Sequence, residues 1–411
     1  MASSEMPLVT VITPSFNQGK FIRETIESVL SQDYLNIEHI VIDGGSSDET
    51  LSILKEYESR DSRFHFVSEP DNGQSHALNK GLKLAKGSII GWLNSDDTYL
   101  TKSVKKAVDT LENHPEWAMV YGSAYITNEE NKILKTAPVQ PFNIENLFHG
   151  CIICQPAAFI KKKVLDKLGG IDESFDFCMD YDLWLRISKN NHKIGYVEDF
   201  LANSRFHPSS KTATSFVDIG FPEILRTSLK NYGTASNNWI NHFLLNHYNK
   251  GPYWYLKLFK SNSIFGPTPK ISQSNLYEDS WAPSFLRLFI ENNEEKPLHS
   301  LIIKGTQENY HWSAFRFYLN GECFKTIKVD KGPFTIELEI PSQQTDSIID
   351  IICKQTHISN DNRKISYKIT EIIPLSEEEN QFIKEFQKGS KNVVNWMNHN
   401  RKPIPNFPLE I

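Results

Sequence analysis

Short apolar runs alternate with longer segments of helical periodicity over the first hundred residues. Four short apolar runs predict buried strands, at 8–13, 37–42, 63–67 and 88–93. Between them, helices are predicted to start near Phe21 and Glu49 and to run over 75–85. Asp48 is a candidate helix cap, and Gly87 a candidate helix stop. Because strands and helices alternate, we expect an α/β domain with a parallel sheet.

The second half of the chain has a different pattern. Six short alternating runs predict the strands of an all-β sandwich, at 285–290, 300–304, 314–319, 324–329, 334–340 and 348–353. Asn320-Gly321 predicts a type I′ hairpin turn between two of them. Ser376 and Glu379 predict a capping box that opens a last helix. We therefore expect an α/β domain over 1–233, a helical and irregular connector over 234–275, the sandwich over 276–375, and a C-terminal helix and tail over 376–411.

Length, charge and cysteine usage narrow the class of protein. A chain of 411 residues is long enough for two domains, and its net charge of −6 argues against a nucleic-acid partner. The N-terminus lacks a signal-peptide pattern, and no apolar run reaches the roughly 18 residues that cross a bilayer. We expect a cytoplasmic protein, with peripheral attachment to the inner face of the plasma membrane and homo-oligomer formation left open. Five cysteines do not resemble a disulfide framework, and we expect Cys151 and Cys154 to be structural.

Polar side chains follow the predicted strands at the edge where ligands bind in parallel sheets. Thr13, Asp43, Glu69 and the segment 94–97 all lie there. Adjacent carboxylates such as those of 96 and 97 are costly after a buried strand unless a cation joins them, and Mg²⁺ or Mn²⁺ suits carboxylate and diphosphate oxygens. A solvated, helix-capping turn is the alternative. Similarly, Asp43-Gly44-Gly45 either approaches a ligand closely or makes a tight turn.

Four motifs together resemble glycosyltransferase family 2, which has the GT-A fold. They are Thr13-Pro-Ser-Phe-Asn17, Ile42-Asp-Gly-Gly-Ser-Ser-Asp-Glu-Thr50, Leu93-Asn-Ser-Asp-Asp97 and Met179-Asp-Tyr-Asp-Leu-Trp-Leu-Arg186. The resemblance covers roughly residues 7 to 232 and implies a site for a nucleotide-sugar donor. The residues that it assigns to donor binding are Thr13, Pro14, Ser15, Phe16, Asp43, Asp71, Asn94, Ser95 and Asp96. It further implies a divalent cation, Mn²⁺ or Mg²⁺, held by Asp96 and Asp97, and Asp180 as the general base.

The chain departs from the family pattern at two positions. Asn94 stands where the family usually has an Asp, and Met179 replaces the acid that usually precedes the base. His207 occupies a place where relatives carry a His or Arg near the diphosphate, so it either completes the metal shell or is a surface histidine. Arg205 and Lys211 nearby are candidates for pairing with phosphate. Asp180 itself has a second interpretation, because aspartate is a frequent helix cap.

The resemblance implies an inverting transfer of a sugar from a nucleotide-diphosphate sugar, usually a UDP-sugar, to a hydroxyl. The expected acceptor is a saccharide or lipid-linked saccharide, in surface polysaccharide or glycolipid assembly. One alternative is a catalytically silent carbohydrate-binding protein that uses the C-terminal sandwich, which itself resembles an accessory β-domain of some bacterial glycosyltransferases. Trp281, Trp312 and Tyr318 could stack on sugar rings there, but we expect most of them to be buried. A sugar-nucleotide pyrophosphorylase ranks last, because 13–20 lacks a Gly-rich signature with Arg and Lys.

Overall fold

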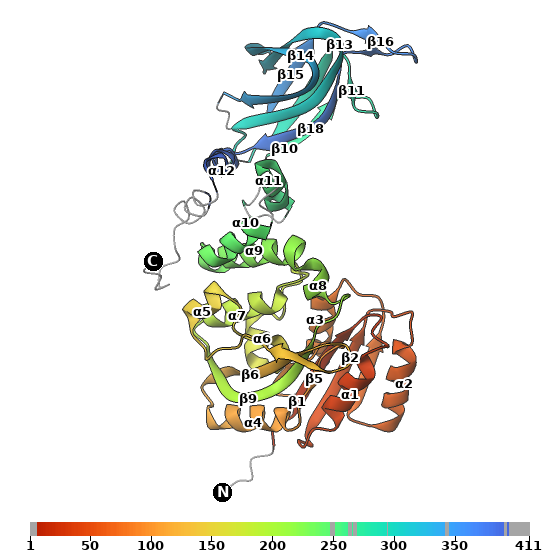
Figure 1. Ribbon diagram of the computed structural model, residues 1–411, viewed down its shortest axis with the longest axis vertical. Helices are drawn as coiled ribbons and strands as arrows, with labels where there is room; N and C mark the ends of the chain where they lie inside the picture. The colour runs from red at the N-terminus through yellow and green to blue at the C-terminus, as the bar shows by residue number, and fades with distance from the viewer. Residues whose placement is uncertain are drawn as a thin grey trace. The chain divides into compact units, whose positions relative to one another are not determined.

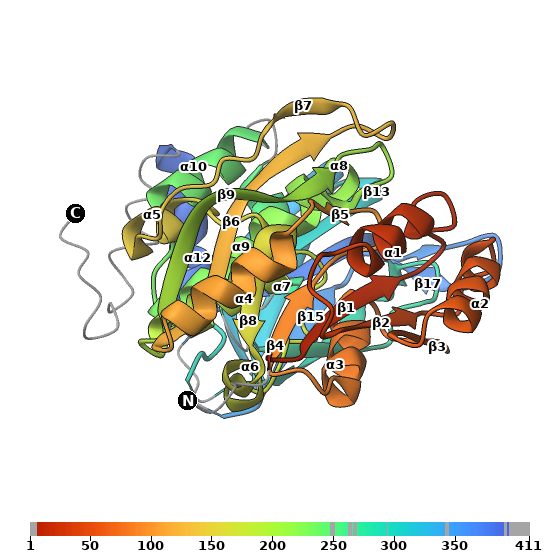
Figure 2. The same ribbon diagram turned by 90° about the horizontal axis from the view of Figure 1, so that it is seen from below.

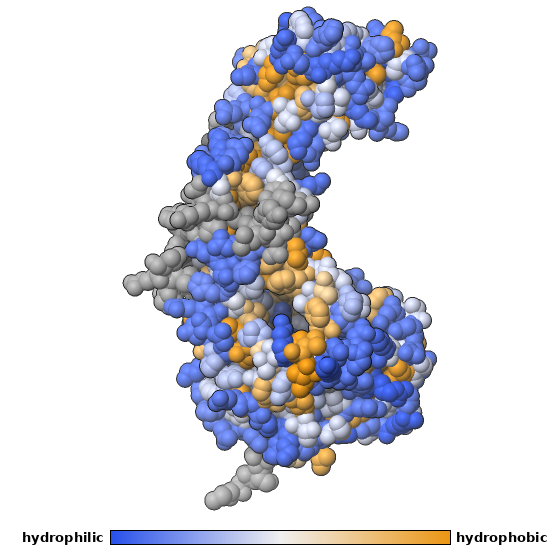
Figure 3. Space-filling view, viewed as in Figure 1, coloured by the Kyte–Doolittle hydropathy of each residue, from blue (hydrophilic) through white to orange (hydrophobic). Residues whose placement is uncertain are grey.

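The protein folds into two compact units, one within the first 247 residues and one within residues 248–396 (Figure 1). The computed structural model describes residues 6–246, 251–261, 265, 269–293, 295–341, 345–389 and 393. On the face shown in Figure 3, both units are mostly polar with scattered apolar patches. In the described part of the chain, no helix is both long and apolar enough to cross a membrane.

The first unit is built on a nine-stranded mixed sheet in the order β3-β2-β1-β4-β8-β6-β9-β5, with β7 paired to β6. Its strands are β1 (Val9–Ser15), β2 (Ile37–Asp43), β3 (Phe64–Ser68), β4 (Ile89–Trp92), β5 (Thr98–Tyr99), β6 (Trp117–Thr127), β7 (Ile133–Thr136), β8 (Ala158–Lys161) and β9 (Lys193–Arg205). The first four strands pair in parallel, so their carboxyl ends share one edge as predicted. Beyond β4 the sheet is mixed, because β8 runs antiparallel to both β4 and β6.

Helices cover both faces of this sheet (Figure 2). The helices of the first unit are α1 (Ile22–Leu30), α2 (Thr50–Arg60), α3 (Gln74–Leu84), α4 (Ser103–Asn113), α5 (Ile144–His149), α6 (Lys162–Leu168), α7 (Met179–Lys189), α8 (Lys211–Ser215), α9 (Phe221–Tyr232) and α10 (Asn237–Asn246). Successive residues of a strand point to opposite faces. Accordingly Ile12 packs in one core with Leu78 of α3, whereas Val11 packs in another with Val104 and Val108 of α4. Burial on both faces explains why the strands read as continuous apolar runs.

The sequence predicted a cap for α2 at Asp48 and an end for α3 at Gly87, and the structure agrees with the first but not with the second. The Asp48 carboxylate accepts a hydrogen bond from the Thr50 N–H at 3.0 Å, as expected for a residue that caps α2. Gly87 does not end α3, because the helix stops at Leu84 and the capping Ala85 is extended. Instead, a Cβ at Gly87 would lie 2.6 Å from the backbone nitrogen of Thr10. The glycine is therefore required by close packing against β1 rather than by a left-handed cap.

The second unit is an antiparallel sheet of seven strands with a shared apolar core. Its strands are β10 (Lys270–Ser274), β11 (Trp281–Ala282), β12 (Phe285–Glu291), β13 (Ser300–Leu319), β14 (Glu322–Glu339), β15 (Ser347–Cys353) and β18 (Tyr367–Leu375); β16 (His357–Ile358) and β17 (Lys364–Ile365) form a separate pair. Two helices, α11 (Pro252–Ser261) and α12 (Glu377–Lys388), belong to this unit. The fold class is thus the predicted one, an α/β domain followed by an all-β domain.

The long strands β13 and β14 correct the predicted strand count. Each joins two runs that the sequence pattern separated, because the ladder continues across a register shift between Gln307 and Trp312. The first part of β13 pairs with β18 and the last part pairs with β15. The single long strand β13 therefore connects the strands on its two sides into one sheet. The pattern gave no prediction for β18, whose burial along the strand is irregular.

Local predictions in the second unit can also be compared with the structure. Asn320 and Gly321 both have positive φ, at 48° and 93°, as a type I′ turn requires, and Ser376 and Glu379 make both hydrogen bonds of the capping box. The expected burial of the aromatic residues is wrong, since Trp312 is 47% exposed and Trp281 and Tyr318 are half-buried. Within the predicted connector, α10 and α11 are helical; 247–250, 262–264 and 266–268 lie outside the described residues, as do 390–392 and 394–411 of the predicted tail.

The Gly321→Ala variant tests the hairpin turn. Because an L-residue at φ 93° is strained, we expect a loss of about 1 kcal/mol in the free energy of unfolding, measured by denaturant titration. Gly150→Ala is the matched control, since a Cβ there meets nothing within 4 Å and its φ is −169°. Equal stability of the two variants would show that the turn is not strained by a side chain.

Candidate active site

A cavity of about 590 Å³ opens at the carboxyl edge of β1 and β4. Its wall combines the ends of these strands, the start of α3 and the segment that follows β9. Nine of the twelve predicted site residues line it: Pro14, Ser15, Phe16, Asp71, Asn94, Ser95, Asp96, Asp97 and His207. Segments almost two hundred residues apart therefore meet in one place, and the volume is in the usual range for a small-molecule site.

Thr13 and Asp43 lie behind this wall rather than in it. Both are fully buried. The Thr13 hydroxyl is bonded to His39 Nε2 at 2.9 Å. Asp43 Oδ2 accepts hydrogen bonds from the Ser46 N–H at 3.0 Å and the Ser68 hydroxyl at 2.6 Å. These hydrogen bonds tie the Thr13 side chain to β2 and the Asp43 side chain to the end of β3 and the loop that follows β2, and neither side chain lines the cavity.

The neighbouring carboxylates of Asp96 and Asp97 differ in environment. Asp96 is partly exposed to the cavity, and its Oδ2 lies 3.1 Å from Nε2 of the buried His207. Asp97 points inward, where its Oδ1 accepts the Arg205 N–H at 2.8 Å. Burial, and secondarily the charge of Asp96, raise the pKa of Asp97 well above its usual range. Asp96 is thus the better-placed ligand, and Asp97 chiefly fixes the end of β9.

The donor set that could hold a divalent cation is small. No group of three metal-ligating side chains occurs among the described residues. However, Asp96 and His207 converge on one point of the cavity wall, and a hard cation is commonly held by one or two protein ligands together with substrate oxygens. These two residues therefore fit a cation that shares its coordination with a diphosphate.

Asn94 lies at the centre of a hydrogen-bond network whose directions can be assigned. The Trp92 indole N–H can only donate, so the atom that it contacts at 2.9 Å must be the Asn94 oxygen. The same oxygen accepts from Gln74 at 2.8 Å, and the Asn94 amide then donates to Gln155 at 3.0 Å and more weakly to Asp97. A carboxylate at 94 could not donate these last two bonds, which explains the departure from Asp.

A second cavity of about 300 Å³ adjoins the first. Six residues line both cavities: Gln74, Asn94, Asp97, Ser204, Lys211 and Thr212. The other walls are mostly apolar, and Asp180 is their one carboxylate apart from Asp97. The side chain of Asp180 keeps some exposure to the cavity, yet burial raises its pKa to about 6. Cys151 and Cys154 lie in the same wall as free thiols.

Asp180 lies in the first turn of α7, and Glu223 of α9 fixes that turn. The buried Glu223 carboxylate accepts the backbone N–H groups of Asp176, Phe177 and Cys178 at 2.8–3.0 Å. Glu223 therefore binds the N–H groups that precede α7, and the Asp180 carboxylate accepts the adjacent Tyr181 N–H at 2.7 Å. No local sequence pattern could have identified Glu223, which lies 45 residues from Cys178.

The other residues singled out near the site have structural partners. Arg205 is buried, where it donates to Glu24 and Asn131 and lies over the Phe21 ring. The Lys211 ammonium donates to the Asp176 carbonyl, and burial lowers its pKa. Lys211 lines both cavities, whereas Arg205 lines only the first. Lys211 is therefore a better candidate than Arg205 for contact with phosphate.

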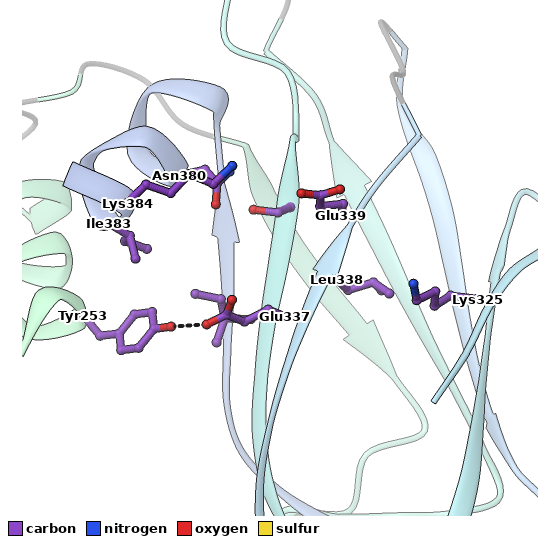
Figure 4. A pocket seen from close by; sticks show the side chains of 10 residues that line it. Tyr253, Lys325, Glu337, Leu338, Glu339, Asn380, Ile383 and Lys384 are labelled. Atoms are coloured by element: carbon purple, nitrogen blue, oxygen red, sulfur yellow. Dashed lines mark hydrogen bonds between the residues drawn. The ribbon is translucent and has the colours of Figure 1, made fainter. Parts of the chain in front are cut away.

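A separate cavity of about 240 Å³ lies in the second unit, between α11, α12 and the strands β13 and β14 (Figure 4). Tyr253 donates a hydrogen bond to Glu337 at 2.7 Å across it. All its residues belong to the second unit, so it contains none of the aspartates of the first.

The sequence is similar to those of known glycosyltransferases over the part of the chain that forms most of the first cavity. The profile described as Glycosyl transferase family 2 matches residues 10–169. An uncharacterized glycosyltransferase of Methanocaldococcus jannaschii is 28% identical over 273 residues, 64% of this chain and 91% of that protein. One of Rickettsia prowazekii is 30% identical over 222 residues, 51% of this chain and 67% of that protein. The chondroitin synthase of Escherichia coli is 28% identical over 184 residues, 45% of this chain and 27% of that enzyme.

The matched residues include the whole wall formed by the ends of β1 and β4, whereas Asp180 and His207 lie beyond the profile. With the strand order and the carboxylates at the sheet edge, these similarities lead to one conclusion. The chain belongs to glycosyltransferase family 2, and its first unit has the GT-A fold of that family.

Proposed function

We propose that the protein is an inverting, cation-dependent glycosyltransferase that moves a sugar from a UDP-sugar to a hydroxyl of a saccharide or lipid-linked saccharide. The observation that supports this most is the common boundary of the two cavities, which lies between Asp96 and Asp180. A donor diphosphate at Asp96 and an acceptor at Asp180 would then present their reacting atoms to one another. The similarity to a chondroitin synthase supports a role in polysaccharide assembly.

The proposed reaction is a single displacement. The acceptor oxygen bonds to the anomeric carbon from the face opposite the diphosphate, the bond from that carbon to the diphosphate oxygen breaks, and Asp180 takes the hydroxyl proton. A cation held by Asp96 and His207 would offset the negative charge of the leaving diphosphate. Lys211 would contribute a further positive charge at the boundary of the cavities.

A panel of nucleotide sugars tests the proposal. We expect a UDP-sugar to raise the thermal unfolding temperature in the presence of Mn²⁺, and to be consumed when acceptor saccharides are added. If every donor of the panel stays unhydrolysed and untransferred, the proposal is wrong, and binding of saccharides alone would favour the carbohydrate-binding alternative.

Asp180→Asn should lower the turnover number by orders of magnitude, about 10²–10⁴-fold, while UDP affinity changes little, because only the proton acceptor is lost. Steady-state kinetics and calorimetry measure the two quantities. Asp166→Asn, which changes an exposed carboxylate on α6, is the matched control. Unchanged turnover in the Asp180 variant would contradict its role as base.

The pH profile gives an independent test of Asp180. A base must be ionised, and the buried carboxyl has a pKa of about 6. We therefore expect kcat/KM to fall about tenfold per pH unit below about 6 and to level off above it. The residual activity of Asp180→Asn should lack this inflection. An acid limb near pH 4 instead would point to an exposed carboxylate as the base.

Asp96→Ala should abolish the dependence of UDP binding on Mn²⁺, because His207 alone offers one ligand. Isothermal calorimetry with and without Mn²⁺ measures this dependence. Asp33→Ala, an exposed carboxylate beyond the end of α1, is the control. A wild-type Mn²⁺ dependence in the Asp96 variant would remove this residue from the metal site.

A further inference from the structure

At the start of β7, two exposed aliphatic side chains lie between two lysines in the sequence. Ile133 and Leu134 are 52% and 54% exposed, and Lys132 and Lys135 beside them are exposed too. We call residues 132–135 the docking tip. Figure 2 shows β7 at the outer edge of the sheet, where it is paired to β6. We propose that the docking tip binds the surface of an anionic lipid bilayer.

The turn that carries the docking tip is held in a defined shape. Asn128 Oδ1 accepts the Lys132 N–H at 2.8 Å, and Asn131 takes the left-handed conformation with φ 62°. The Asn131 side chain donates to Glu24 at 2.9 Å and accepts from Arg205 at 2.6 Å. These hydrogen bonds fix the turn, and the pairing of β7 with β6 then holds the two aliphatic residues in a strand where each side chain is open to solvent. A displayed tip loses little conformational entropy when it binds.

Local charge favours an anionic surface as the partner. The acidic neighbours of the tip are paired, Glu129 with Lys20 and Glu24 with Arg205, both at 2.5 Å. Exposed Glu130 is the other carboxylate of the turn, so one negative charge there compares with the two positive charges of Lys132 and Lys135. Lysines that flank apolar side chains can contact lipid phosphates while the aliphatic groups enter the boundary with the acyl chains. Because the whole protein carries a net charge of −6, this attraction is confined to the tip.

The position of the tip suggests what the contact is for. The chain runs from β7 directly into Ala137, Pro138 and Val139, which line the cavity of Asp180, and Ile126 of β6 lines it as well. A bilayer bound at 132–135 therefore lies a few residues from the cavity that we propose for the acceptor. This step, the delivery of a lipid-linked acceptor, rests on the proposed function, whereas bilayer binding itself does not.

Vesicle co-sedimentation of the full-length protein tests the proposal without donor or acceptor. The two probes are vesicles of phosphatidylcholine alone and vesicles with about 30% phosphatidylglycerol added. We expect binding to the anionic vesicles that weakens as salt is raised. The double variants Ile133→Ser/Leu134→Ser and Lys132→Gln/Lys135→Gln should each lower the partition coefficient about tenfold. Leu35→Ser is the matched control, since Leu35 is 74% exposed at the amino end of β2 and should have no effect.

Three outcomes would overturn the proposal: no binding of the wild type at low salt, equal partition of Ile133→Ser/Leu134→Ser and wild type, or a wild-type dimer in sedimentation equilibrium that this variant dissociates. The last result would make the tip a contact between two copies. Thermal unfolding of each variant checks that it is folded. Loss of vesicle binding with intact hydrolysis of a UDP-sugar would separate failure at the tip from failure of the proposed reaction.

Discussion

The position of the proposed base depends on one buried carboxylate, that of Glu223. Three backbone N–H groups before α7 point at this side chain, and a helix N-terminus attracts negative charge. A second polar contact joins the two helices, since buried Asp182 of α7 accepts from Thr227 of α9 and also from Arg186 of its own helix. Polar groups inside a core are stable only when each finds its partner, so these bonds define one arrangement of the two helices. Asp180, at the end of this arrangement, is left with few partners of its own.

The two cavities divide the chemistry between a polar side and an apolar side. The side at Asp96 collects carboxylates, hydroxyls and an imidazole, which suits a charged nucleotide. The side at Asp180 is mostly apolar, so an ionised carboxylate is destabilised there and becomes a stronger proton acceptor. The six shared residues form the border, where the amides of Gln74 and Asn94 are hydrogen-bonded to each other beside the ionisable Asp97 and Lys211.

Periodicity in the sequence predicted the first four strands and the first three helices of the first unit, and it placed most of the site residues at one edge of the sheet, but it gave no prediction for β5 to β9. It could not predict which polar side chains turn inward. The inward direction of Asp43 depends on Ser68, and that of Asp97 on the backbone of Arg205, 108 residues away. The role of Glu223 could not be predicted either, because the N–H groups that it binds are 45 to 47 residues away in the sequence. In the second unit, alternation identified stretches of β13 and β14 but not their continuity, because a register shift interrupts the alternation without ending the strand.

The network at Asn94 has an evolutionary consequence. Since the Trp92 indole fixes the direction of every bond in it, the residues at 74, 92, 94 and 155 form a set in which each choice constrains the others. A lineage that exchanged Asn94 for the aspartate usual in the family would place a carboxylate against the oxygen of Gln155 and the charge of Asp97. Such an exchange removes both bonds that the Asn94 amide donates unless its neighbours change with it. We therefore expect the residues at these four positions to change together rather than singly.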